Sequence, residues 1–133
     1  MNKLQISIPS DINNIMYVEN FVDDLMGSFE LPKNFFGRIT LSVVEAVNNA
    51  ILFGNNRQLE KKVAIIAEMK DKQLFVSVRD EGKGFDYSVI PDPTLPVNID
   101  KEKGRGLYLM KSLSDNLEFS KDGSEVTLIF DLV

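Results

Sequence analysis

The chain has 133 residues, of which 44% are hydrophobic and 26% charged, and its formal net charge is −5. These values are typical of one soluble domain with a hydrophobic core, and the acidic balance argues against nucleic acid as a partner. The sequence contains neither cysteine nor histidine. This excludes disulfides, thiolate or imidazole metal sites, and catalytic triads built on histidine, so a general base has to be a carboxylate or, less readily, Lys or Tyr.

Hydrophobic periodicity and turn residues divide the chain into helices and strands. Three helices are expected at residues 11–26, 33–53 and 107–113, and five strands at 4–8, 63–69, 74–79, 117–121 and 126–133. Ser10 or Asp11 is expected to cap the first helix, and Gly54 to end the second. No hydrophobic run approaches the ~20 residues of a membrane span, so we expect no membrane contact and a cytoplasmic location.

The order of these elements predicts the fold class. Turn signals at residues 70–72 and 121–124 join neighbouring strands as hairpins, which makes the sheet mostly antiparallel. The helices would then cover one face of the sheet. We therefore expect an α/β two-layer sandwich with a mostly antiparallel mixed sheet, formed as a single domain over residues 1–133.

The first candidate site follows the strand at 74–79. Asp80 continues the even-numbered set of that strand, which points towards the core, and Gly82 and Gly84 come directly after it. Glycine lets a backbone approach a flat ligand closely. A carboxylate acceptor beside such a segment suits the amino group of adenine, although an ordinary Asx turn followed by a glycine loop has the same pattern.

The second candidate site lies on the long helix. Glu45 and Asn49 are four residues apart and share one face, which Arg38 and Ser42 extend. Such a stripe is often a solvated helix face. If it faces a ligand instead, Asn49 could give a neutral oxygen to Mg²⁺, and Glu45 could orient or deprotonate a nucleophile.

The third candidate site is the start of the last helix, at Gly104, Arg105 and Gly106. Free backbone N–H groups and the helix dipole make a helix start an anion site, and Lys103 or Arg105 would add charge. An ordinary glycine-rich helix start has the same pattern, and no Walker A sequence is present. The preceding segment, 85–103, is long and contains three prolines, which is typical of a functional or mobile loop.

Taken in order, these motifs resemble the ATP-binding GHKL superfamily, and within it the small bacterial anti-sigma factor serine kinases. The resemblance extends over nearly the whole chain. It is carried by Val44-Glu-Ala-Val-Asn-Asn-Ala50, Asp80-Glu-Gly-Lys-Gly-Phe85, Pro91-Asp-Pro93 and Gly104-Arg-Gly-Leu-Tyr-Leu-Met110. One departure is that Phe53 stands where the family usually has histidine.

The resemblance implies a function and a role for each site residue. Family members phosphorylate a serine on an anti-anti-sigma (STAS-domain) protein with Mg²⁺ and ATP; many sequester a sigma factor, and they commonly form dimers. By position, Glu45 becomes the catalytic base, Asn49 the Mg²⁺ ligand and Asp80 the adenine acceptor. The remaining nucleotide-binding residues would be Gly82, Gly84, Gly104, Arg105, Gly106 and Ser124, beneath an ATP lid at about 86–103.

Two alternatives remain open at this point. In the first, nucleotide gates the binding of a partner protein without catalysis, which the loss of histidine at Phe53 favours. In the second, the chain is a histidine-kinase-like catalytic domain that phosphorylates another protein in trans. Acid stability of the product separates phosphoserine from phosphohistidine.

Overall fold

The computed structural model describes residues 2–82, 102–120 and 123–132, and these form two layers. The strands are β1 (Lys3–Pro9), β2 (Lys62–Lys70), β3 (Gln73–Arg79), β4 (Asn116–Ser120) and β5 (Glu125–Asp131). The helices are α1 (Ile15–Ser28), α2 (Phe36–Asn49) and α3 (Glu102–Leu113). Short helical segments η1 (Ile12–Asn14), η2 (Lys33–Phe35) and η3 (Ala50–Gly54) precede α1, precede α2 and follow α2.

The strands form one sheet in the order β1-β2-β3-β5-β4, and every pair in the described sheet is antiparallel. The β2–β3 hairpin closes at the pair Lys70 and Gln73, with Asp71 at φ 56° between them. Asp tolerates this left-handed conformation better than most residues, which explains why the turn falls there. β1 and β4 are the edge strands of the described sheet.

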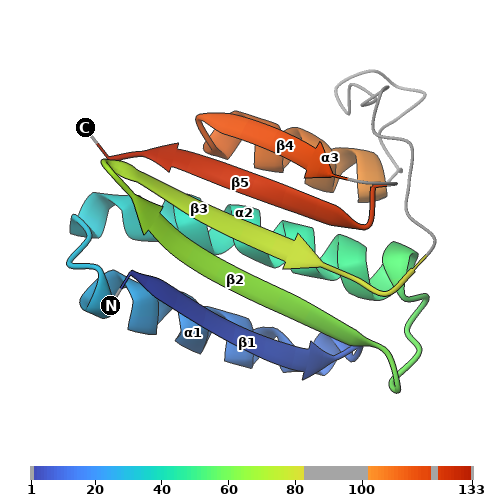
Figure 1. Cartoon of the computed structure of the whole chain (residues 1–133). Coiled ribbons are helices and arrows are strands. Elements are labelled where there is room, and N and C mark those ends of the chain that lie inside the picture. The colour runs from blue at the N-terminus through green and yellow to red at the C-terminus, as the bar shows by residue number, and fades with distance from the viewer. Residues whose placement is uncertain (1, 83–101, 121–122, 133) are drawn as a thin grey trace.

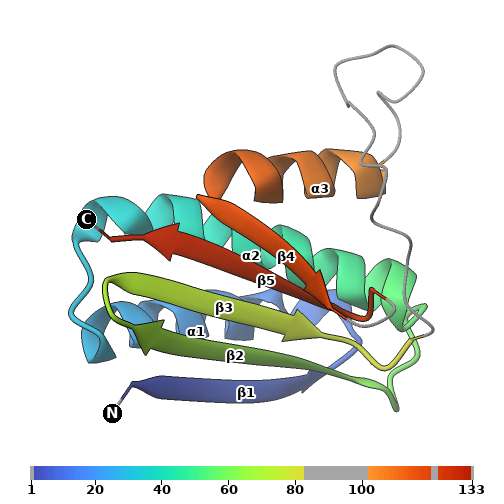
Figure 2. The same ribbon diagram turned by 45° about the horizontal axis from the view of Figure 1, so that its top comes forward.

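All three helices lie on one face of the sheet, with α2 between α1 and α3 (Figures 1 and 2). The predicted two-layer α/β sandwich is therefore confirmed. Because α2 packs beside α3 and also contacts β3 and β5, the long helix is the element that joins the candidate sites. Within the described ranges, no helix is both long and apolar enough to cross a membrane.

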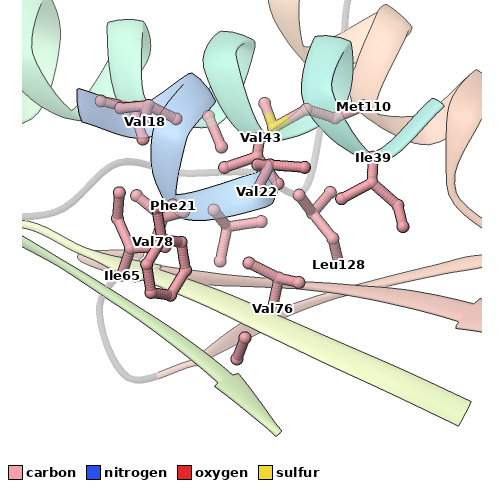
Figure 3. Close-up of a cluster of buried hydrophobic side chains, with 14 of the residues drawn as sticks. Val18, Phe21, Val22, Ile39, Val43, Ile65, Val76, Val78, Met110 and Leu128 are labelled. Carbon is pink, nitrogen blue, oxygen red and sulfur yellow. The ribbon is translucent and has the colours of Figure 1, made fainter. Parts of the chain in front are cut away.

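The core lies between the sheet and the helices (Figure 3). In β3 the alternate residues Leu74, Val76 and Val78 are buried, as the period-2 pattern predicts. Side chains from all three helices meet them, among them Val18, Phe21, Val22, Ile39, Val43 and Met110. The even-numbered side chains of β3 therefore face the helices. Asp80, two positions after Val78, continues this set and is directed to the helix side as well.

Two helix ends differ in their chemistry. The side chain of Asp11 accepts a hydrogen bond of 2.9 Å from the backbone N–H of Asn13 and so caps η1, which leads into α1. Ser10 is buried and donates to the carbonyl of Lys61 instead, so of the two expected caps it is Asp11 that acts. The second helix end is the C-terminal end of α2, where the helix widens into the π-helical segment η3, which ends at Gly54. π-Helical turns often occur at functional sites.

Candidate functional site

A cavity of about 230 Å³ lies between α2 and α3, and three of the candidate residues line it. Glu45 and Asn49 contribute from α2, and Arg105 contributes from α3. The remaining lining residues are Asn48, Leu52 and Leu109. The structure therefore brings together two groups of residues that lie more than fifty positions apart in the sequence.

Gly106 forms part of the same site because it packs directly on these side chains. A β-carbon at Gly106 would lie 3.1 Å from Oε2 of Glu45 and 3.3 Å from both Nδ2 and Oδ1 of Asn49. Gly104, two residues earlier on α3, is also buried. Any larger residue at Gly106 would push on the carboxylate and the amide, so α3 approaches α2 this closely only because glycine is there.

Asn49 is 7% exposed, and no described residue hydrogen-bonds to its Nδ2 atom. Among the same described residues, Oδ1 of Asn48 is likewise buried without a partner. Buried polar atoms are almost always paired in proteins. Two unpaired amide atoms on one helix turn are therefore what a polar ligand would satisfy.

The donor set fits a magnesium nucleotide better than a metal cage. In the described part of the chain, no group of three or more Asp, Glu, His or Cys side chains could hold an ion. Magnesium often takes only one or two protein oxygens and obtains its other ligands from water and substrate phosphates. The amide of Asn49 can supply one such oxygen, so the residues present fit Mg²⁺ bound together with a phosphate group.

Asp80 directly follows the end of β3 and does not line this cavity. Its backbone N–H donates to the carbonyl of Ser124 (2.9 Å), and its Oδ1 accepts from the backbone N–H of Gly82 (2.8 Å). A second, small space of about 10 Å³ lies beside Asp80; it is lined by Ala46, Asn49, Ala50, Val78, Asp80, Met110, Gly123, Ser124 and Val126. This has room for about one water molecule, so a flat base would have to widen it.

Asn49 borders both spaces, so the candidate residues that the structure describes lie around this one side chain. Asp80 and Ser124 line the small space with it, Glu45 and Arg105 line the larger cavity with it, and Gly106 packs on its amide. Gly82 is held beside Asp80. Gly84 and the segment proposed as a lid, up to residue 101, lie outside the described residues.

The start of the last helix was predicted wrongly. The sequence placed it at Leu107, after the glycine pair, whereas α3 begins at Glu102 and contains Gly104 and Gly106. Glycine in a helix interior costs about 1 kcal/mol relative to alanine, and contact with α2 offsets that cost here. The glycines thus serve helix packing as well as any ligand.

Two members of the polar stripe on α2 do not belong to the site. Ser42 is fully buried and donates to the carbonyl of Arg38 (2.7 Å), a hydrogen bond within the helix. Arg38 donates through Nε to the carbonyl of Leu113 (3.0 Å) and so binds the far end of α3. Of the stripe, only Glu45 and Asn49 reach the cavity.

Two residues near the site were not predicted as site residues. Gly54 lies against the carboxylate of Asp80, since a β-carbon there would be 2.3 Å from Oδ2. Asn48 lines the cavity beside Asn49. Gly54 carried a local signal only as a helix end, and Asn48 lay just off the predicted stripe. Phe53, which replaces the usual histidine, is on η3 and is 38% exposed.

Comparison with known proteins gives the family. Residues 8–130 match the family model described as the histidine kinase-like ATPase domain. The chain belongs to this family. Membership in the histidine kinase-like ATPase family implies nucleotide binding, and it confirms the resemblance seen in the sequence.

Relatives in this family include bacterial regulators. The chain is 27% identical over 119 residues to the anti-sigma F factor of Shouchella clausii, covering 88% of this chain and 82% of that protein. It is 24% identical to the anti-sigma F factor of Bacillus subtilis (96% and 89% covered) and 20% identical to the serine-protein kinase RsbW of Bacillus cereus (96% and 82% covered).

The fold is also that of a solved structure. The crystal structure of the RsbU and RsbW domains of a Mycobacterium tuberculosis protein matches 99% of this chain with a TM-score of 0.72 and 17% identity. This chain spans 32% of that longer chain. At this identity the match supports the histidine kinase-like fold alone.

Proposed function

We propose that the chain binds Mg²⁺ and ATP across the two spaces that Asn49 joins. The observation that carries the proposal is the buried amide of Asn49, whose Nδ2 has no hydrogen-bond partner among the described residues. Asn49 borders the small space that Asp80 lines and the cavity that Glu45 lines, and its amide lies against Gly106. A nucleotide extended past Asn49 would place its base in the first space and its phosphates in the second.

The base end would be held by Asp80. A carboxylate has about four lone-pair positions and can accept several hydrogen bonds, so the bond from Gly82 is compatible with a further one from the amino group of adenine. Ser124 borders the same small space and is proposed as a second contact with the base. Gly82 and Gly84 complete the proposed base-binding set.

The phosphate end would be held by α3. Gly104 lies in its first turn, where free N–H groups and the helix dipole favour anions. Arg105 would add positive charge, and Gly106 would leave room for a phosphate to approach. Asn49 would hold the metal through its Oδ1 atom, which lies against Gly106 on the same helix as the proposed phosphate contacts. When bound, Mg²⁺ neutralises charge that develops on the transferred phosphoryl group.

Glu45 is proposed as the catalytic base of a serine kinase. It would take the proton from a serine hydroxyl of the partner protein as that oxygen bonds to the γ-phosphorus. The bond between the γ-phosphorus and its bridging oxygen breaks, so the products are phosphoserine and ADP. Glu45 suits this role because Oε2 lies close to Gly106, at the phosphate side of the site.

The proposed partner is a small anti-anti-sigma (STAS-domain) protein, with a sigma factor as a second partner that the chain sequesters. The names of the relatives, anti-sigma F factor and serine-protein kinase RsbW, support both partners. We further propose that residues 1–133 act as a single domain, as a homodimer and in the cytoplasm.

A phosphotransfer assay tests the proposal. The chain is used to co-purify partners from its native host, and each partner is incubated with the chain and γ-labelled ATP in a single turnover. We expect acid-stable label on a serine of the partner. Acid-labile label would identify a histidine acceptor, and no label with bound ATP would exclude the kinase.

Phe53 favours one second candidate function, a nucleotide-gated binding module without catalysis. Its side chain can neither carry charge nor donate a hydrogen bond, and it occupies the π-helical segment beside the site. Such a module would bind its partner with an affinity that depends on ATP while its phosphotransfer rate stayed at background. Partner affinity measured with and without ATP, alongside the single-turnover rate, separates the two functions.

A further inference from the structure

Asn55 is fully buried just after η3, and its side-chain amide connects three segments of the chain. Its Nδ2 donates to Oγ of Ser10 (2.8 Å) and to the carbonyl of Lys62 (3.0 Å). Its Oδ1 accepts from the backbone N–H of Glu81 (2.7 Å). These partners follow β1, begin β2 and follow β3, so one amide holds three strand ends together.

The bond to Glu81 fixes the segment that carries the proposed adenine acceptor. Glu81 lies between Asp80 and Gly82, and its own carboxylate accepts from the backbone N–H of Lys62. The backbone N–H of Asp80 is held from the other side by Ser124. Two successive backbone N–H groups are therefore held in place. The N–H of Asp80 is bonded to Ser124, just before β5, and the N–H of Glu81 is bonded to Asn55.

Asn55 itself lines neither of the two spaces, and with no exposed surface it cannot contact a nucleotide directly. Its effect on a ligand would pass through the position of Glu81 and thus of Asp80. A fully satisfied buried network of this kind makes a segment rigid, and removal of the amide would leave the N–H of Glu81 without its acceptor.

We propose that Asn55 is a positioning residue for nucleotide binding, which sets the affinity for the base by holding the Asp80–Gly82 segment in place. The inference rests on the proposed function, because it takes Asp80 as the adenine acceptor. It adds that affinity for the base depends on a buried amide with no contact to the ligand, acting through its bond to Glu81.

The first arm of the test needs no nucleotide. Amide hydrogen exchange of Glu81 is measured by NMR in the wild-type protein, in Asn55→Ala and in Ser10→Ala. Loss of its acceptor should speed exchange at Glu81 about tenfold or more in Asn55→Ala. Ser10→Ala removes another bond of the same network but leaves the Asn55–Glu81 bond, so exchange at Glu81 should stay within about twofold.

The second arm measures ATP and ADP affinity by calorimetry and, with a protein substrate, KM and kcat. Asn55→Ala should weaken ATP and ADP by the same factor, about 3- to 10-fold, because both share the base. The KM for ATP should rise while kcat at saturating ATP stays unchanged, the pattern of lost uniform binding. Ser10→Ala should leave the affinities for ATP and ADP unchanged, even if it lowers the unfolding temperature as much as Asn55→Ala does.

The outcomes separate the inference from the function on which it rests. If the wild-type protein binds ATP and Asn55→Ala binds it equally well, the inference is overturned and the function stands. If the wild-type protein binds no nucleotide, both are overturned. If Asn55→Ala does not fold, hydrogen exchange in the wild-type protein decides. Glu81 is an exposed residue, but its N–H is bonded to Asn55, so this N–H should exchange at least about a hundredfold more slowly than in an unfolded peptide, and unprotected exchange there overturns the inference.

Discussion

A β-carbon added at Gly54 would lie 2.3 Å from Oδ2 of Asp80, so the end of the α2–η3 helix and the end of β3 meet without room for one more atom. The carbonyl of Gly54 is in turn only 2.0 Å from where a β-carbon of Gly82 would be. Real β-carbons do not come within 3.0 Å of such atoms. The helix end therefore sets where the Asp80 carboxylate can point.

Gly54→Ala should weaken ATP binding while leaving the fold intact. The three atoms nearest to the new methyl group all belong to the carboxyl group of Asp80, so this group has to turn aside to make room. If the turned carboxylate loses a charged hydrogen bond to adenine, affinity should fall roughly 10-fold or more. Calorimetry gives the affinity, and thermal unfolding gives the stability.

Gly27→Ala is the matched control for this change. Gly27 lies in α1, with nothing within 4 Å of an added β-carbon. Alanine should stabilise that helix by up to about 1 kcal/mol and leave ATP affinity unchanged. Normal ATP binding by Gly54→Ala would mean that the position of the Asp80 carboxylate does not matter.

Gly106→Val should weaken ATP more than adenosine. Its branched side chain would press on Glu45 and Asn49 and occupy the phosphate side of the site, far from the base. Adenosine lacks phosphates, so its loss of affinity measures any general damage to the site. Competition titration with both ligands decides. Equal weakening of the two would leave the phosphate role of Gly106 without support.

Replacing Arg38 should lower the stability of the fold without changing the candidate site. Its Nε donates to the carbonyl of Leu113, and its Nη2 lies 3.3 Å from Oδ2 of Asp115, so it ties α2 to the end of α3. Arg38→Met keeps the length of the side chain but removes both bonds. We expect the free energy of unfolding in urea to fall by about 1–2 kcal/mol.

An exposed ion pair provides the control for Arg38. Nζ of Lys70 lies 3.8 Å from Oε1 of Glu68 within β2, and such surface pairs contribute about 0–1 kcal/mol. Lys70→Met should therefore change stability less than Arg38→Met does. A stability loss in Lys70→Met that equals that of Arg38→Met would count against the tie between α2 and α3.

Strands, helices and the residues that share one of their faces were predictable because the same spacing of side chains repeats along a short stretch of chain. Val76 and Val78 alternate with polar neighbours, and the same burial that confirms the strand also directs Asp80 towards the helix layer. Glu45 and Asn49 line one cavity because four residues make about one helical turn. Hairpin turns could be predicted in the same way, as at Asp71.

Contacts between distant segments could not be predicted from such patterns. Arg38 and Leu113 are 75 positions apart, and nothing local in Arg38 distinguishes a tie to α3 from a solvated charge. Asn55 comes directly after Gly54, the expected helix end, where Asn is common for local reasons, so its place in the sequence predicts no further role. Its role in holding Glu81 depends on where β1, β2 and β3 end, which only the assembled sheet determines.

The last prediction separates the two carboxylates of the site. Asp80 is proposed to bind the base, an interaction present both before and during the reaction. Asp80→Asn keeps the shape but replaces a charged acceptor with a neutral amide. A hydrogen bond to a charged group contributes roughly 1.5–3 kcal/mol, so ATP affinity should fall about 10- to 150-fold. Circular dichroism confirms that the variant is folded before calorimetry measures its affinity.

Glu45 is proposed to act on the incoming serine, so Glu45→Ala should give the opposite result. Phosphoryl transfer should disappear while ATP binding is largely kept, or even strengthened slightly, because a negative charge near the phosphates has been removed. If Glu45→Ala phosphorylates the partner at the wild-type rate, Glu45 is not the base. If folded Asp80→Asn binds ATP normally, the adenine site is elsewhere, and the assignment of both sides of Asn49 fails with it.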